Sequence, residues 1–294
     1  MELTLANTVI GVIGGSGLYV MEGLTETREH QIETPFGATS DPVVTGRLDG
    51  VPVAFLARHG TGHRLIPSEV PYRANVYALK TLGVRYLISV SAVGSLREEI
   101  EPLDLVIPDQ FIDLTKRRES TFFGQGAVAH VSMAEPVCGA LSGALALTIA
   151  DCGLPVRLHR GGAYVCIEGP AFSSQAESTW YQSMGASVIG MTSMPEAKLA
   201  REAEIAYTTL ALVTDYDCWH PHEAHVSADL ALANLAKNAG NAQRIIRVLA
   251  QRLHQAPPPS AAHTALSTAL VTRPEQMTAE TRARLHALIN MRTA

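Results

Sequence analysis

Short apolar runs alternate with longer amphipathic segments along most of the chain. Runs of β-branched and aliphatic residues are typical of buried strands, and segments whose apolar residues recur every three or four positions are typical of helices. The pattern predicts strands at 9–13, 43–44, 53–57, 86–90, 165–167, 188–189 and 207–213, and helices that begin at Pro71, at Pro136 and, after Pro195, at Glu196. This alternation predicts an α/β fold with a mostly parallel or mixed central sheet.

The longest periodic segment follows Ser227, a residue type favoured at helix N-caps. Its apolar residues recur at alternating spacings of four and three as far as Leu253. We interpret most of this stripe as a helix face packed in the core. The proline-rich run 257–260 then separates residues 1–256, which we expect to form one domain, from 257–294, a C-terminal extension of two helices expected to pack on it.

Composition narrows the classes of partner and compartment. The chain has 294 residues, with 23 Lys+Arg against 28 Asp+Glu, a net charge of −5 at pH 7 and a pI near 6.1. That balance argues against nucleic-acid and anionic-membrane partners. The four cysteines have no C-x-x-C spacing, the N-terminal residues have no leader pattern, and no apolar run approaches the ~20 residues of a membrane span. We therefore expect a cytoplasmic protein with reduced thiols.

The first predicted strand ends in a glycine-rich turn, Gly14-Gly15-Ser16-Gly17. Backbone N–H groups and a hydroxyl in such a turn suit a phosphate. The spacing matches neither G-x-G-x-x-G nor a P-loop. An ordinary strand-terminating turn is therefore an equal alternative to a phosphate site.

Polar residues also follow three other predicted strands. Arg58 and His59 end one of them, and an arginine fork matches phosphate while a histidine can add a donor. Ser91 begins the segment Ser-Ala-Val-Gly-Ser at the end of the second, and Thr192 follows the third. A surface salt bridge is the commoner fate of an arginine on its own. Together, however, four such strand ends can converge along one edge of the sheet, where α/β proteins bind ligands.

Two polar clusters lie between the last predicted strand and the long helix. Asp215 and Asp217 can form a general-acid or ligand-anchoring pair, and a turn with solvated aspartates is an equal alternative. His220, His222 and His225 resemble a metal-binding cluster. An intervening proline prevents helical display and no zinc-type spacing is present, so we favour a polar loop and expect no metal.

Nine segments resemble the methylthioadenosine phosphorylase branch of the purine nucleoside phosphorylases, in the family's order over residues 9 to 253. The segments are Ile13–Leu18 (IGGSGL), Thr34–Gly37 (TPFG), Leu56–Gly60 (LARHG), Ser91–Arg97 (SAVGSLR), Asp109–Asp113 (DQFID), Met133–Pro136 (MAEP), Glu168–Ser174 (EGPAFSS), Met191–Glu196 (MTSMPE) and Thr214–Trp219 (TDYDCW). The resemblance implies a single-domain α/β fold like that of nucleoside phosphorylases, with a mixed central sheet flanked by helices.

The resemblance implies phosphorolysis of methylthioadenosine, in which phosphate displaces adenine and methylthioribose 1-phosphate forms. Such an enzyme is a pentosyltransferase of purine and methionine salvage, with inorganic phosphate as co-substrate and no metal or organic cofactor. Carried over from the family's motifs, the phosphate ligands are Ser16, Arg58, His59, Ser91, Ala92 and Thr192. They lie at the four strand ends singled out above.

The nucleoside-binding residues carry over from the family in the same way. Met191 matches the residue at the ribose, and Phe172 matches the aromatic ring beside base and sugar. Asp215 and Asp217 match the adenine-reading pair, with Asp215 as the catalytic acid. His130 matches a loop histidine that enters the site of a neighbouring subunit, and a solvated loop histidine is the alternative. The resemblance thus implies a homo-oligomer, expected to be a homotrimer, with a hexamer as the alternative.

Departures from the family's pattern bear on specificity. Ser16 and Ser91 stand where the family often has threonine, which keeps the hydroxyl. Ala228 replaces a larger aliphatic residue near the 5′ pocket and is expected to widen it. Ser173 and Asp215 stand where 6-oxopurine members carry Glu and Asn, so the expected base is adenine.

Two other functions compete with this interpretation. A 6-oxopurine nucleoside or methylthioinosine phosphorylase would share the fold and phosphate site, but the acceptor oxygens of Asp215 match a 6-amino group. A non-catalytic nucleoside-binding protein is expected to lack a phosphate ligand or Asp215, and the sequence keeps them all. Phosphate-dependent release of adenine separates the three functions.

Overall fold

A computed structural model describes residues 9–15, 21–223 and 225–289. The strands are β1 (Val9–Gly14), β2 (Leu24–His30), β3 (Glu33–Thr34), β4 (Gly37–Ala38), β5 (Val43–Leu48), β6 (Val51–Ala57), β7 (Val84–Ser95), β8 (Leu105–Ile107), β9 (Gln110–Asp113), β10 (Leu158–Arg160), β11 (Ala163–Cys166), β12 (Ala186–Gly190) and β13 (Ala206–Asp215). The α-helices are α1 (Tyr72–Thr81), α2 (Gly139–Asp151), α3 (Gln175–Ser183), α4 (Ser193–Glu202), α5 (Ala228–Gln255), α6 (Leu266–Ala269), α7 (Ala279–Arg284) and α8 (His286–Ile289).

One mixed sheet runs through the centre of the molecule in the order β10-β8-β13-β7-β1-β6-β5-β2. Its middle strands β6, β1, β7 and β13 are parallel, whereas β5 and β2 are antiparallel additions at one edge. β12 pairs antiparallel with β7 and brings β11 and β9 with it. This topology confirms the predicted mixed central sheet.

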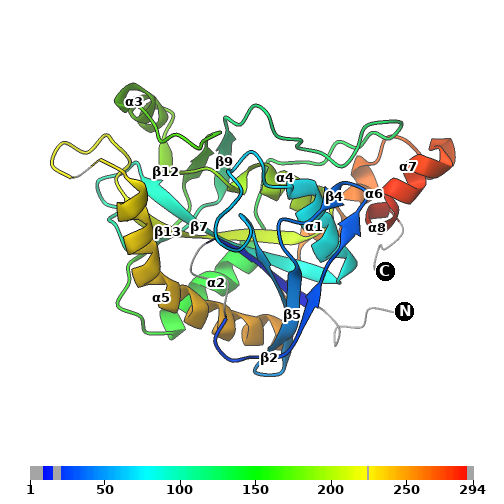
Figure 1. The fold of residues 1–294 in the computed structure, drawn as a ribbon, viewed down its shortest axis with the longest axis horizontal. Coiled ribbons are helices and arrows are strands. Elements are labelled where there is room, and N and C mark those ends of the chain that lie inside the picture. Colours follow the sequence, from blue (N-terminus) through cyan, green and yellow to red (C-terminus); the bar gives the residue numbers. More distant parts are fainter. Residues whose placement is uncertain (1–8, 16–20, 224, 290–294) are drawn as a thin grey trace.

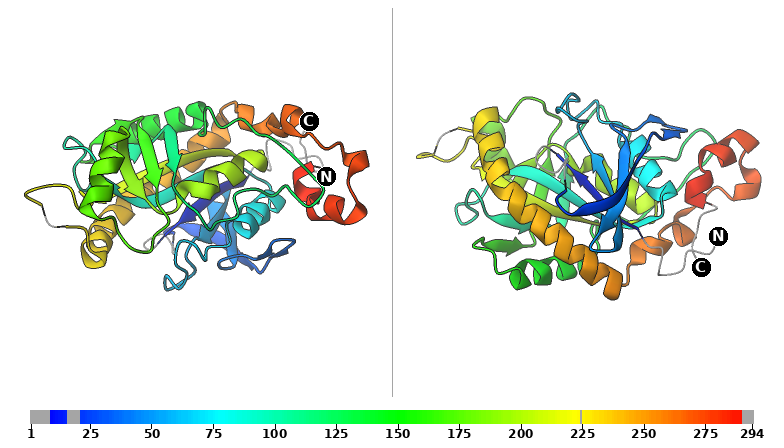
Figure 2. Two further views of the ribbon diagram at one scale, coloured as in Figure 1. Left: turned by 90° about the horizontal axis from the view of Figure 1, so that it is seen from above. Right: turned by 60° about the horizontal axis from the view of Figure 1, so that its bottom comes forward.

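Helices cover both faces of the sheet (Figures 1 and 2). α5 and α2 pack together on one face, and α1 and α4 pack together on the other. β13 is buried along its whole length because it lies between these two layers. The continuous apolar run predicted at 207–213 reflects this double burial.

Local signals set several element boundaries. Ser227 is the N-cap of α5, since the Leu230 backbone N–H donates to its hydroxyl at 3.2 Å, as predicted. The helix expected to begin at Pro136 begins instead at Gly139. Cys138 serves as its N-cap, because its sulfur accepts a hydrogen bond from a backbone N–H in the first turn.

The segment after α5 packs against α1 and β7. The Tyr86 hydroxyl donates to the Pro258 carbonyl at 2.7 Å, and the Ala287 N–H donates to the Tyr77 hydroxyl at 3.4 Å. Leu288 of α8 is buried in the same apolar cluster as Tyr77. Three short α-helices and two short 3-10 helices occupy the part of this segment that the structure describes, where the sequence predicted two helices.

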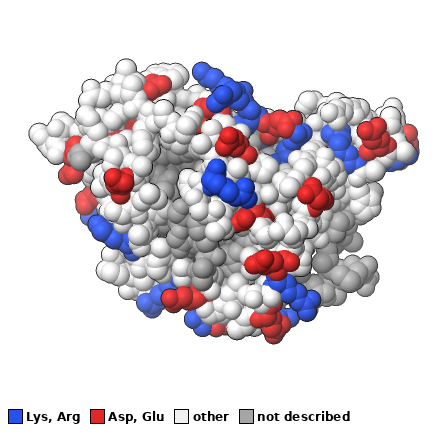
Figure 3. All heavy atoms as spheres, viewed as in Figure 1, with Lys and Arg blue, Asp and Glu red and all other residues white. Residues whose placement is uncertain are grey.

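Surface features bear on the classes of partner. On the face seen in Figure 3, basic and acidic side chains are interspersed rather than gathered by sign. All four cysteines are buried and free. Within the described residues, no helix is both long and apolar enough to cross a membrane.

Candidate active site

A cavity of about 740 Å³ opens where β6, β12 and β13 end and beside the second half of β7. The predicted site residues that line it are Arg58, His59, Ser91, Ala92, Phe172, Ser173, Met191, Thr192, Asp215, Asp217 and Ala228. Ser16 lies outside the described residues. His130 is exposed on the loop before α2 and does not line this cavity. Gly15 at the end of β1 also lines the cavity, so the described parts of all four predicted segments meet here. Two details differ from the prediction, because β7 continues past Ser91 to Ser95 and β12 enters antiparallel to β7.

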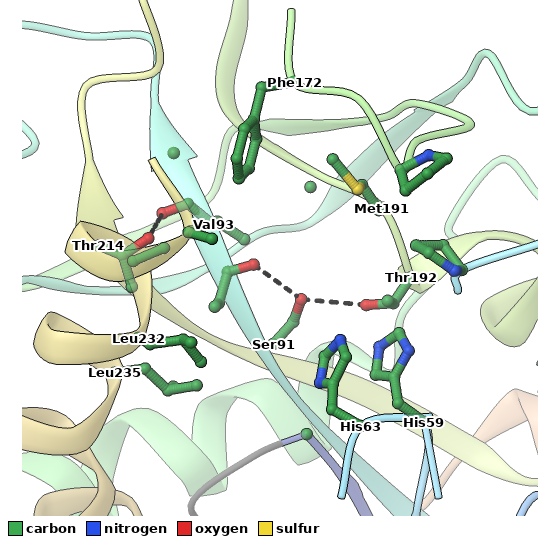
Figure 4. A pocket seen from close by; sticks show the side chains of 18 of the residues that line it. His59, His63, Ser91, Val93, Phe172, Met191, Thr192, Thr214, Leu232 and Leu235 are labelled. Carbon is green, nitrogen blue, oxygen red and sulfur yellow. Dashed lines mark hydrogen bonds between the residues drawn. The ribbon is translucent and has the colours of Figure 1, made fainter. Parts of the chain in front are cut away.

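Hydroxyl groups gather at one end of the cavity (Figure 4). The Ser91 hydroxyl oxygen lies 3.1 Å from that of Thr192. Behind the cavity wall, the buried Tyr164 hydroxyl oxygen lies 3.3 Å from that of Ser91. A Cβ at Gly190 would lie 2.0 Å from the Tyr164 hydroxyl oxygen, so only glycine fits where β12 passes this cluster. Hydroxyls can donate to the oxygens of a small anion. This end of the cavity therefore suits phosphate.

His59 and His63 stack beside the hydroxyl cluster, with ring centroids 4.3 Å apart (Figure 4). His59 Nδ1 lies 2.9 Å from the Leu65 carbonyl oxygen and so must carry a proton there. Burial, reinforced by the charge of Arg58, lowers the pKa of His59 to about 4. Neutral His59 therefore presents an acceptor at Nε2, where the sequence suggested a donor, and it can accept from a protonated phosphate oxygen or a sugar hydroxyl.

The Arg58 guanidinium is only 1% exposed and pairs with Glu196 at the start of α4. Arg58 Nε donates to Glu196 at 2.9 Å, and Nη2 donates to Glu196 at 3.2 Å and to Ser89 at 2.7 Å. Burial by itself would lower the pKa of Arg58, but the Glu196 carboxylate raises it above its ordinary value. The arginine fork is thus turned largely toward the protein. The salt bridge of Arg58 is therefore buried, whereas the alternative considered from the sequence was a surface salt bridge. Arg58 places a fixed positive charge at the cavity wall.

The other end of the cavity holds the buried Asp215 carboxyl group. It accepts hydrogen bonds from the Thr214 hydroxyl at 2.7 Å and from the Asp217 backbone N–H at 2.8 Å. Burial raises the pKa of Asp215 to about 6, and the nearby Asp217 charge adds to that shift. A Cβ at Gly94 would lie 2.8 Å from Asp215 Oδ1, so β7 holds the carboxyl closely in place. Near neutral pH the carboxyl can thus be either a proton donor or an acceptor.

Asp217 is buried beside Asp215, and burial raises its pKa as well. Its backbone has a positive φ of 53°, which turns the chain sharply after β13. The turn is tied to α5, because Asn234 donates to the Thr214 carbonyl at 2.7 Å. The aspartates are therefore held inside the protein, and the alternative of a turn with solvated aspartates is wrong.

The first turns of α5 form an apolar wall of the cavity, on which Leu232 and Leu235 lie (Figure 4). Leu232 remains 51% exposed, although the sequence placed it in the stripe interpreted mostly as core. The core interpretation holds farther along, where Ile246 and Leu249 are buried against the sheet. The helix therefore changes role along its length, and its first half adjoins the Asp215 turn.

Three residues of the site were not singled out from the sequence: Thr214, Glu196 and His63. Leu235 was placed in the apolar stripe interpreted mostly as core, and it lines the cavity instead. Thr214 and Glu196 lie in the segments Thr214–Trp219 and Met191–Glu196, which resemble the family's motifs. That resemblance could have identified both residues. His63 has no comparable local signal, because its position follows from the loop after β6 folding back over the cavity.

The histidine-rich loop is built differently from a metal site. His220 stacks on Tyr216, with centroids 4.6 Å apart, and lies 3.2 Å from Glu98. Among the residues that the structure describes, no group of three or more His, Cys, Asp or Glu side chains is arranged to hold a metal ion.

The sequence of this chain is similar to those of known phosphorylases. Residues 9–251 match the family model of the phosphorylase superfamily. The S-methyl-5'-thioadenosine phosphorylase of Thermosynechococcus vestitus is 59% identical over 281 residues, covering 95% of this chain and 97% of that protein.

Two solved structures extend the comparison. A methylthioadenosine phosphorylase from an antarctic soil metagenomic library has a TM-score of 0.92 and 61% identity, over 96% of this chain and 99% of that one. A variant of the adenosine/methylthioadenosine phosphorylase of Schistosoma mansoni, solved with methylthioadenosine, has a TM-score of 0.78 and 35% identity, over 84% and 92%.

Proposed function

The chain belongs to the phosphorylase superfamily, and from this membership we propose that it catalyses the phosphorolysis of S-methyl-5'-thioadenosine. The products are adenine and S-methyl-5-thioribose 1-phosphate, and the reaction serves purine and methionine salvage. One observation carries the proposal: a single cavity joins a hydroxyl cluster suited to phosphate to a buried carboxyl pair suited to adenine. Relatives at 59% and 61% identity bear the name of this activity.

In the proposed reaction, phosphate occupies the end of the cavity lined by Ser91, Ala92 and Thr192. By the family's motifs, Ser16, His59 and the positive charge of Arg58 complete the proposed phosphate site. One phosphate oxygen bonds to the anomeric carbon as the bond from that carbon to the purine breaks, and the bonding electron pair passes into the base. Positioning supplies most of the catalysis, because phosphate itself is the nucleophile.

Asp215 is proposed to receive the leaving base. As an acid it gives a proton to purine N7, and as an anion it stabilises an N7-protonated base. Its oxygens and those of Asp217 accept hydrogen bonds from donors such as the 6-amino group of adenine. Ser173 lies beside this pair, and Phe172 and Met191 line the part of the cavity assigned to base and ribose.

The 5′-methylthio group is proposed to lie against α5. Leu232 and Leu235 give this wall its apolar character, and Ala228 leaves it wider than a larger aliphatic residue would. The wall supports an apolar 5′ substituent in preference to a charged one.

The direct test is to measure adenine release from methylthioadenosine with and without phosphate. We expect release to require phosphate and methylthioadenosine to have a higher kcat/KM than methylthioinosine. A preference for methylthioinosine would instead identify a 6-oxopurine enzyme. Nucleoside binding without turnover would indicate a non-catalytic binding protein.

We further propose a homo-oligomer, expected to be a homotrimer, in which His130 completes the site of a neighbouring subunit. His130 is exposed and lies outside this chain's own cavity, and its backbone N–H donates to the Ala269 carbonyl at 2.8 Å. The four buried free cysteines support a cytoplasmic location.

Mixing two inactive variants tests the shared site. His130→Ala subunits keep Asp215, and Asp215→Asn subunits keep His130, so reassembly of the two should make about one quarter of the sites intact in a cyclic oligomer. The measurement is activity of the reassembled mixture against each variant alone. A fully active monomer, or a mixture no more active than its parents, would contradict the shared site.

A further inference from the structure

Arg118 lies in the loop after β9, with a side chain only 1% exposed, yet it does not line the cavity. Its Nη1 group donates to the Met191 and Met194 carbonyls, each at 2.6 Å, and to the Tyr72 hydroxyl at 3.1 Å. Met191 lies in the turn between β12 and α4, next to the proposed phosphate ligand Thr192, and Met194 lies in the first turn of α4. The Nη1 group of Arg118 thus fixes the backbone beside the proposed phosphate site.

The other terminal nitrogen of Arg118 holds a different wall. Nη2 donates to the Glu168 carbonyl at 2.7 Å and to the Ile167 carbonyl at 3.3 Å. Ile167 lines the cavity, and the same segment continues to Phe172 at the base and ribose. Since β11 and β12 are adjacent parallel strands, one side chain bridges the turns that leave both of them.

Glu168 extends the connection to a third loop. Its carboxylate lies 3.6 Å from Arg118 Nε and accepts from the Lys116 backbone N–H at 2.5 Å. It also accepts from the hydroxyl of Ser68, which follows the cavity-lining loop after β6. The buried cation therefore lies near a carboxylate, which in turn connects it to the loop after β6.

We propose that Arg118 is a positioning residue that sets the distance between the phosphate-binding turn and the nucleoside-binding turn. Lysine cannot replace it, because an ammonium group presents donors from one point whereas the planar guanidinium reaches both turns at once. Misplacement of bound reactants by about 1 Å can cost 100-fold in rate. The inference rests on the proposed phosphorolysis, since both turns are assigned to its two substrates.

The test compares Arg118→Met and Arg118→Lys with Arg117→Met, which removes the same charge from the exposed neighbouring side chain. We expect Arg118→Met to raise KM for phosphate and for methylthioadenosine each by roughly ten-fold and to lower kcat/KM by about 100-fold. Arg118→Lys should recover only part of this loss, and Arg117→Met should change each constant less than about two-fold. Rates are normalised to folded protein, and melting temperatures are measured in parallel.

A purely structural role gives a different result. Arg118 variants with a lower melting temperature but wild-type KM for both substrates would overturn the proposal. If Arg118→Met does not fold, the KM values of Arg118→Lys decide: unchanged values overturn the proposal and raised values support it. Wild-type enzyme that releases no adenine would overturn the proposed function instead, so the two failures are distinguishable.

Discussion

Replacing Asp215 by asparagine should lower kcat/KM for methylthioadenosine by about 10²–10⁴-fold, the usual contribution of a general acid. The geometry should survive, because the asparagine carbonyl can still accept from the Asp217 N–H and the Thr214 hydroxyl can turn to the Val93 carbonyl, 3.2 Å away. The loss then reports the chemistry of the carboxyl rather than a change of shape. The measurement is steady-state kinetics under saturating phosphate.

The same variant tests base choice. An amide can direct its N–H toward a 6-oxo group, whereas a carboxylate opposes it with another acceptor and leaves buried groups unpaired. The ratio of kcat/KM for methylthioadenosine to that for methylthioinosine should therefore fall in Asp215→Asn. A wild-type preference for methylthioinosine would show that the assignment of the aspartate pair is wrong.

The raised pKa of Asp215 also predicts how the variant changes stability with pH. Its pKa is about 6 in the folded protein against an ordinary 3.8, so the folded state binds more protons between these values. The proton on Asp215 stabilises the folded protein relative to the unfolded chain. This stabilisation is fully present below pH 3.8 and is lost as pH rises through about 6. Above that, wild type carries a penalty of about 3 kcal/mol that asparagine removes. The melting temperature of Asp215→Asn relative to wild type should rise between pH 4 and pH 8, and a constant difference would contradict the shift.

Removing Glu196 should produce the largest loss of stability. Glu196→Ala leaves the Arg58 cation buried without its partner, and the Tyr207 hydroxyl loses its acceptor at 2.9 Å. Breaking a buried ion pair from one side costs about 3–5 kcal/mol in the free energy of unfolding. Urea unfolding measures this change. Glu101→Ala, which breaks the exposed pair with Arg157, is the matched control and should cost less than about 1 kcal/mol.

A double variant separates stability from phosphate binding. Arg58→Met with Glu196→Met replaces the pair by apolar groups of similar length and should recover much of the lost stability. It also removes the positive charge from the cavity wall, so KM for phosphate should remain raised by roughly ten-fold or more. A stable double variant with wild-type phosphate KM would exclude the Arg58 charge from phosphate binding.

Local sequence determined the positions of most elements and of several functional strand ends. Apolar runs predicted β6, β7 and β13, because buried strands need continuous apolar residues, and Ser227 marked the start of α5 through its capping hydroxyl. The two-residue hairpin between β5 and β6 turns at Asp49-Gly50, where both residues adopt a positive φ, and this dipeptide is typical of such turns. Family motifs then pointed to the residues now found around one cavity.

Tertiary structure alone decided what those residues can do. Arg58 meets a carboxylate 138 positions away, so no local pattern shows that its fork is occupied. The Leu65 carbonyl sets which nitrogen of His59 carries the proton, and burial sets the protonation of Asp215. The four carbonyls bonded by Arg118 belong to the segments that follow β11 and β12, which are adjacent only in the folded sheet. Periodicity and turn chemistry act over a few residues, whereas desolvation and ion pairing depend on which distant segments the fold brings into contact.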